Sequence, residues 1–140
     1  MAELSAAEGT AIEATSVDLQ KAGFATKFRA LQNPTITTYA TDSAITFANP
    51  ANYAKLTKGS AGAYTLAAPT AAQEGYRLTI LCQSAFAHVV TATDLLDDGV
   101  TGGAKDTATF GAFVGSTLEL IAINLKWHVI GKNVVTIAAV

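Results

Sequence analysis

The chain has 140 residues, of which 50% are hydrophobic but only 14% charged, and its formal net charge is −2. This length fits one domain with a sizeable core, and a charged fraction well below the roughly 25% of ordinary domains indicates a surface covered by partner subunits. The near-neutral balance and the scattered Lys and Arg residues argue against nucleic-acid binding, because no basic field would hold phosphates.

Residues 1–34 differ from the rest and are interpreted as an N-terminal arm. They are rich in Glu, Ala, Gln and Lys, and they begin without a basic-then-apolar run, so we expect a soluble, unexported protein with no membrane span. Phe24, Phe28 and Leu31 lie at helical spacing and predict a short amphipathic helix over 16–31. The alternative is an extended segment lying on a neighbouring subunit. Either way, these three side chains are the predicted anchoring contacts.

Residues 35–140 are predicted to form a β-rich domain. Short runs of Thr, Ile, Val, Tyr and Phe alternate with Gly, Asn, Pro and Asp, a pattern typical of a sheet protein with many turns. The predicted strands are 35–40, 44–48, 53–57, 63–67, 77–83, 87–92, 107–110, 117–123, 127–130 and 134–138.

The spacing of these strands predicts how they pair. Residues 124–126 and 131–133 are read as turns of a C-terminal meander, and residues 94–104 (DLLDDGVTGGA) as a long acidic loop. About ten short, closely spaced strands predict an all-β fold, an antiparallel sandwich or barrel of 8–10 strands.

The single cysteine and the two histidines are interpreted as structural residues. Cys82 stands in the apolar run RLTILCQS and is predicted to be a buried strand residue. His88 and His128 lie in predicted strands and belong to no spaced ligand set, so we expect them to be hydrogen-bonded in the sheet or exposed on its face.

No motif predicts catalysis, a cofactor or a metal. Ser84, His88 and Asp94 offer the residue types of a hydrolase triad, but no GxSxG frame presents a nucleophile. Asp94, Asp97 and Asp98 could bind a cation, yet the run lacks the alternating spacing of a calcium loop, and a solvated loop is the preferred interpretation.

Two further sets of residues are assigned to structure. The glycines of the acidic loop lack the spacing of a phosphate-binding motif and are interpreted as loop residues: Gly99, Gly102 and Gly103. Three aromatic residues could line a sugar groove, but are assigned to the core or to a subunit interface: Phe110, Phe113 and Trp127.

Four segments resemble a module of phage virion proteins. They are LTKGSAGAYTLAAPTA (56–71), EGYRLTILCQSAFAHVVTA (74–92), ATFGAFVGSTLELIAIN (108–124) and KWHVIG (126–131). In order and spacing they resemble the head-decoration and minor capsid proteins of tailed phages over about residues 44–140. The arm does not match this module.

The resemblance implies a β-rich capsid decoration (cement) protein on the outside of an icosahedral shell. Its partners would be its own copies, as a homotrimer, and the major capsid protein, and its location the virion, after synthesis in the host cytoplasm. The alternatives are a tail or head-fibre module and a virion-surface carbohydrate-binding domain. Copy number in the particle separates the first, and glycan binding the second.

Overall fold

The structure is a computed structural model that describes residues 33–100 and 102–140. The predicted anchoring residues Phe24, Phe28 and Leu31 lie outside these ranges. The described residues form ten strands and one short 3-10 helix, η1 (Ala71–Gln73). The strands are β1 (Thr35–Tyr39), β2 (Ser43–Ile45), β3 (Ala51–Leu56), β4 (Ala63–Leu66), β5 (Arg77–Cys82), β6 (Val89–Asp97), β7 (Lys105–Phe110), β8 (Thr117–Ile123), β9 (Lys126–Asn133) and β10 (Val135–Ala138).

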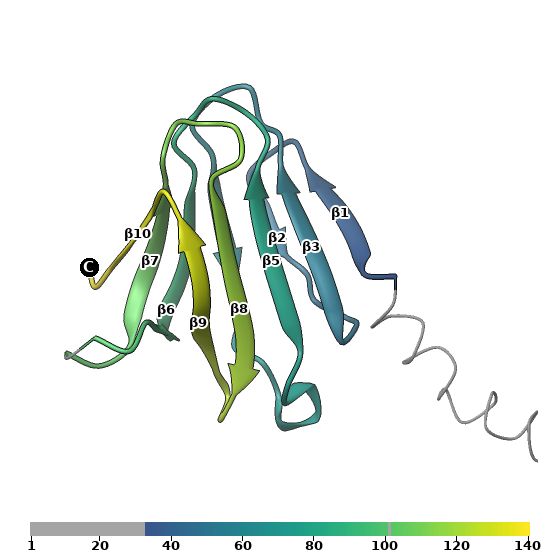
Figure 1. Ribbon diagram of the computed structural model, residues 1–140, viewed down its shortest axis with the longest axis vertical. Coiled ribbons are helices and arrows are strands. Elements are labelled where there is room, and N and C mark those ends of the chain that lie inside the picture. Colours follow the sequence, from purple (N-terminus) through teal and green to yellow (C-terminus); the bar gives the residue numbers. More distant parts are fainter. Residues whose placement is uncertain (1–32, 101) are drawn as a thin grey trace, which may run out of the picture.

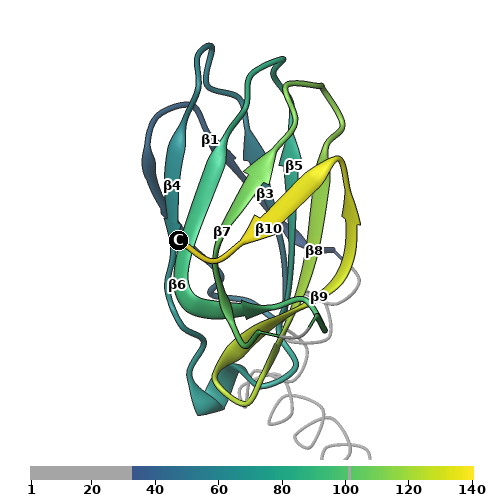
Figure 2. The same cartoon turned by 90° about the vertical axis from the view of Figure 1, so that its left-hand side faces the viewer.

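The strands curl into one nearly closed, barrel-like sheet, which confirms the all-β prediction (Figures 1 and 2). The order is β1-β3-β5-β8-β9-β6-β4-β2, with β7 paired to β6 and β10 paired to β7. Burial alternates along the strands with period two: Tyr64 and Leu66 are buried in β4, and Leu78, Ile80 and Cys82 are buried in β5. The inward side chains therefore form one continuous hydrophobic core enclosed by the sheet.

The pairing is not mainly antiparallel, and the sequence prediction was wrong on this point. Five pairs are parallel: β1–β3, β3–β5, β2–β4, β4–β6 and β6–β9. Four are antiparallel: β5–β8, β8–β9, β6–β7 and β7–β10. β1, β3 and β5 are neighbours in one part of the sheet, and β2, β4 and β6 are neighbours in another. Each of the connections β1–β2, β3–β4 and β5–β6 therefore crosses from one part to the other. Because opposed sheets are only about 10 Å apart, a three-residue connection crosses the core as easily as it closes a hairpin.

Two predicted connections are strands instead. The acidic loop begins later than predicted, because β6 continues to Asp97, with Leu96 fully buried and the Asp106 carboxylate accepting the N–H of Asp94 at 2.8 Å. Residues 131–133 belong to β9, where a Cβ on Gly131 would lie 2.9 Å from Glu119 Oε2. Glycine thus leaves room for that carboxylate on the opposite strand.

One hydrogen-bonded pair joins the two end strands of the sheet, β1 and β2, and a second pair joins β9 to the segment after β4. Tyr39, at the end of β1, reaches the end of β2: its hydroxyl accepts the N–H of Thr46 at 2.8 Å and lies 3.1 Å from Thr46 Oγ1. The indole N–H of fully buried Trp127, in β9, donates to the carbonyl of Ala67 at 2.9 Å. The predicted turn at Asn124 is confirmed, with positive φ at Asn124 and the next residue.

Candidate functional site

The connections that lead from each odd-numbered strand to the following even-numbered strand lie at one end of the molecule, which we call the loop end (top of Figure 1). They are the β1–β2 loop (40–42), the β3–β4 loop (57–62), the β5–β6 loop (83–88) and the β7–β8 loop (111–116). The β9–β10 turn at Val134 joins them, since the N–H of Gly111 donates to the Val134 carbonyl at 2.8 Å. Residues distant in sequence thus share this end.

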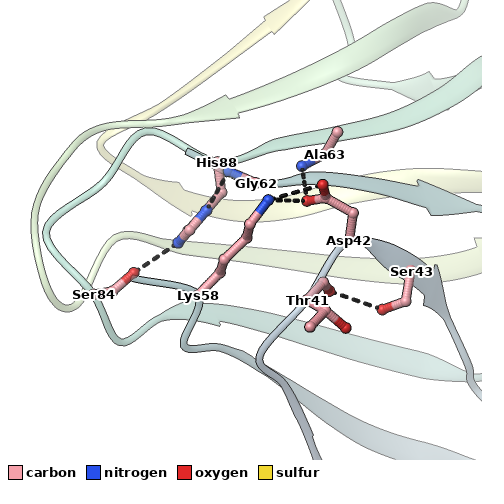
Figure 3. A network of polar contacts seen from close by, with 8 residues as sticks. All are labelled: Thr41, Asp42, Ser43, Lys58, Gly62, Ala63, Ser84 and His88. Atoms are coloured by element: carbon pink, nitrogen blue, oxygen red, sulfur yellow. Dashed lines mark hydrogen bonds and ion pairs between the residues drawn. The ribbon is translucent and has the colours of Figure 1, made fainter. Parts of the chain in front are cut away.

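A fully buried histidine connects two of these loops (Figure 3). The N–H of Gly62 donates to His88 Nδ1 at 3.1 Å, and His88 Nε2 lies 2.7 Å from Ser84 Oγ. Because a backbone N–H can only donate, Nδ1 is the unprotonated nitrogen and Nε2 carries the hydrogen. His88 therefore donates to Ser84.

This tautomer decides the chemistry of the Ser84–His88 pair. A general base must accept the proton of the nucleophile, but the nitrogen that faces Ser84 already carries one. The third group of a triad, a carboxylate on the far nitrogen, is replaced by the N–H of Gly62. Burial lowers the pKa of His88, and the nearby Lys58 charge lowers it further, against a smaller opposite effect of Asp42. The geometry is that of a neutral structural clamp.

Tyr64 packs on the clamp from the core side. Its ring meets the His88 ring edge-on, with centroids 5.6 Å apart, and its hydroxyl is buried without a hydrogen-bond partner among the described residues. Burial raises the pKa of this hydroxyl, with a further contribution from the charge of Asp42. A Cβ on Gly62 would lie 2.8 Å from Tyr64 Cε2 and 2.9 Å from His88 Nδ1, so glycine is required here.

An ion pair lies beside the clamp at the same end. Lys58 Nζ donates to both carboxylate oxygens of Asp42 at 2.8 Å, and Asp42 Oδ1 also accepts the N–H of Ala63 at 2.8 Å. The hydrogen bond from Lys58, followed by that from Ala63, lowers the pKa of Asp42. The charges of the β1–β2 and β3–β4 loops therefore neutralise each other.

The other half of the loop end is apolar. Four large side chains stand out of the surface: Phe86 (41% exposed), Phe113 (65%), Val114 (64%) and Val134 (51%). We call them the loop-end patch. The two loops that carry three of them, 83–88 and 111–116, contain no Asp, Glu, Lys or Arg. Phe113 and Val134 both adjoin Gly111, where a Cβ would lie 3.3 Å from Phe113 Cδ2 and 2.5 Å from Val134 Cγ1. Large contiguous apolar patches on a protein surface mark contacts with partners.

The structure separates the three residues of the sequence-level triad. Ser84 and His88 come together, but Asp94 lies in β6, where its N–H bonds to Asp106 and no contact joins it to His88. In the acidic loop, Asp97 and Asp98 accept the N–H groups of Gly99 and Val100, at 3.1 and 3.2 Å. Within 33–100 and 102–140, no three His, Cys, Asp or Glu side chains are grouped to hold a metal.

The remaining candidates take different positions. His88 is hydrogen-bonded, as predicted, but it lies in the loop just before β6 and not in a strand. His128 lies in a strand, as predicted, and is half-buried, with Nδ1 3.7 Å from Asp97 Oδ2. A free, buried thiol at Cys82 is also confirmed. Of the three aromatics, Phe110 and Trp127 are core residues, whereas Phe113 is exposed. The sequence analysis did not single out the other members of the loop-end patch: Phe86, Val114 and Val134. The feature of the sequence that could have indicated them is the presence of large apolar residues in turns.

A shallow groove of about 580 Å³ lies on the outer face of β3, β5, β8 and β9. Tyr53, Arg77, Glu119 and Ile130 contribute to its walls, and Tyr53 is the one aromatic among the described residues that line it. Sugar-binding surfaces need aromatic rings on which the sugar stacks. This groove offers little of that platform.

A scan of the sequence against protein-family models finds no match, and neither does a search of the curated proteins. No helix in the described part of the chain is both long and apolar enough to cross a membrane.

Proposed function

We propose that this protein is a non-enzymatic virion component, a decoration protein that binds the outer surface of a tailed-phage capsid as an oligomer and stabilises it. The observation that carries the proposal is the loop-end patch: four exposed apolar side chains on a rigid β scaffold, in a chain with few charges. The four-segment resemblance to head-decoration proteins supports the same function. Its partners are other copies, as a trimer, and the major capsid protein, with no role for membrane or nucleic acid.

The chemistry of the described side chains supports a structural role over catalysis. Ser84 and His88 are the pair closest to a hydrolase arrangement, and its proton lies on the wrong nitrogen for base catalysis. Binding, in contrast, needs apolar area on a scaffold that does not have to be ordered first. The described domain provides both.

Attachment to a shell would multiply modest contacts. Apolar area removed from water contributes about 25 cal/mol per Å², less the cost of immobilising the partners. A subunit held at several points has a high effective concentration at each remaining contact, so no single interface has to be large. The arm, through Phe24, Phe28 and Leu31, is the predicted capsid anchor, while the β domain joins the copies.

The test is the copy number in purified particles, measured by mass spectrometry against the major capsid protein. A decoration protein is expected at a ratio near one to one. A few copies per particle would assign the chain to the tail or a head fibre, and absence from the particle would refute a virion role. Binding of the isolated protein to a glycan array would favour the carbohydrate-binding alternative.

A further inference from the structure

We infer that the loop-end patch is a contact between copies of this chain, packed about a rotation axis that passes through the loop end. The inference rests on the proposed function, because both use this surface, and it specifies which partner the surface takes. Three features of the described residues support it: the rigidity of the patch, the strained backbone of Val134, and the distribution of charge.

The patch is held rigid from below. Ser116 is buried, and its hydroxyl lies within hydrogen-bonding distance of two carbonyl oxygens of its own loop, 2.9 Å from Phe113 O and 3.1 Å from Gly111 O. The N–H of Cys82 donates to the Ser116 carbonyl, and the N–H of Gly115 donates to the Cys82 carbonyl, both at 2.8 Å. The loop that exposes Phe113 and Val114 is thus anchored to β5, and little ordering entropy is lost when it binds.

Val134 adopts a backbone conformation that valine avoids. Its φ is +54°, and a β-branched residue in this region is a genuine outlier that costs about 1–3 kcal/mol. Glycine or asparagine would make the same turn with less strain. The valine side chain nevertheless stands half-exposed beside Gly111, where a Cβ on Gly111 would lie 2.5 Å from Val134 Cγ1. Strain of this kind is retained at functional surfaces.

The distribution of charge favours a second copy of this chain as the partner. Near a rotation axis each side chain meets its own equivalent, so any charge there would face a like charge. The loops 83–88 and 111–116 carry no charged residue, and the nearby Asp42 and Lys58 neutralise each other. The outer sheet face, in contrast, carries Arg77 and Glu119. The nearest other charge is that of exposed Lys132, two residues before Val134 in β9. The two loops that carry Phe86, Phe113 and Val114 are therefore a surface that copies of this chain can share without repulsion.

The experiment compares two matched variants of the full chain by sedimentation velocity over a range of concentrations. Phe113→Asp places a carboxylate in the patch. Leu125→Asp makes the same change at a similarly exposed residue (53%) of the β8–β9 turn, at the opposite end, where positive φ suits aspartate. We expect the wild type and Leu125→Asp to sediment as the same oligomer, and Phe113→Asp to shift toward the 14.4 kDa monomer, with self-association weakened at least about tenfold.

A second variant tests the geometry without relying on loss of binding. Val114→Cys places a thiol near the proposed axis, while the native Cys82 is fully buried. Mild oxidation should give disulfide-linked dimers of Val114→Cys and none of Leu125→Cys. Circular dichroism and thermal melting check that each variant is folded.

Each outcome decides the question. A wild type that is monomeric throughout, or a Phe113→Asp variant that remains oligomeric, overturns the inference. So does a monomeric wild type whose binding to purified capsids is lost in Phe113→Asp, which would assign the patch to the shell. Failure of the proposed function is distinguishable: a chain absent from virions that still associates through Phe113 refutes the decoration role and leaves this inference standing.

Discussion

Gly62 and His88 are joined by a hydrogen bond in which the backbone N–H donates to the imidazole Nδ1 at 3.1 Å. This single contact sets the tautomer of a fully buried histidine and joins the β3–β4 and β5–β6 loops. It also makes the clamp sensitive to acid, because a protonated Nδ1 can no longer accept.

The pH dependence of stability follows from that bond. Burial lowers the pKa of His88 in the folded state, so below about pH 6.5 the unfolded chain takes up a proton that the folded chain refuses. We expect the contribution of His88 to the free energy of unfolding to be fully present above pH 6.5. As the pH is lowered from 6.5, the free energy of unfolding should decrease, by at most about 1.4 kcal/mol per pH unit, until the folded-state pKa is reached. Urea denaturation between pH 7.5 and 5 measures this.

The control for the pH series is His88→Gln, which cannot ionise. Its unfolding free energy should vary less over the same range, and the difference between the two curves isolates His88 because His128 is present in both. Equal slopes would show that the clamp does not titrate. Nitrogen chemical shifts of the imidazole would report the Nε2–H tautomer directly.

The fit around Gly62 predicts a steric cost for a single methyl group. Gly62→Ala would drive its Cβ to 2.8 Å from Tyr64 Cε2 and 2.9 Å from His88 Nδ1, so we expect a loss of about 1–3 kcal/mol of unfolding free energy. Gly59→Ala in the same loop meets nothing within 4 Å and should change stability by no more than about 0.5 kcal/mol. Equal effects of the two changes in urea titrations would contradict this account.

The hydrogen bond between Tyr39 and Thr46 can be removed by deleting a single atom, the hydroxyl oxygen of Tyr39. Tyr39→Phe deprives the Thr46 N–H of its acceptor, and the expected cost is about 1 kcal/mol. The amide of Thr46 should also exchange with deuterium faster than in the wild type. Tyr53→Phe, on the outer sheet face, removes a hydroxyl from a half-exposed ring and serves as the control; an unchanged Thr46 amide in Tyr39→Phe would argue against the closure.

The core depends on the single tryptophan. Trp127 is fully buried, packs edge-on against Phe47 with centroids 4.8 Å apart, and donates to the Ala67 carbonyl. Its fluorescence should be blue-shifted in the folded protein, and Trp127→Phe should cost about 1–3 kcal/mol through a cavity and an unpaired carbonyl. Exposed Ile36 is the comparison, because Ile36→Val should cost no more than about 0.5 kcal/mol, as followed by circular dichroism.

The arm is tested by Phe28→Asp. If Phe28 anchors the chain, this variant should lose binding to purified capsids, since a carboxylate replaces an apolar contact, while the thermal melting of the β domain stays unchanged. Glu13→Asp, a charge-preserving change elsewhere in the arm, is the control. Retained binding by Phe28→Asp would refute anchoring through the arm helix or its extended alternative.

Local pattern determined much of what the sequence revealed. Short apolar runs predicted β5 and β8 and placed Cys82 in the core, and burial along both strands alternates with period two, because one face of each strand packs inward. The turn at Asn124 was equally local, since asparagine accepts a positive φ. The all-β class followed from these short-range signals alone.

Tertiary structure decided the rest, because the deciding contacts join residues far apart in the chain. Parallel coils and hairpins have the same short connections, so nothing local distinguishes β1–β3 pairing from a meander. Likewise, Gly62 meets His88 across 26 residues, and the loop-end patch gathers Phe86, Phe113 and Val134 from three separate connections. The sequence by itself determined the all-β class and the place of most strands; only the folded chain decided how far β6 and β9 extend, which strands are neighbours and which apolar side chains remain at the surface.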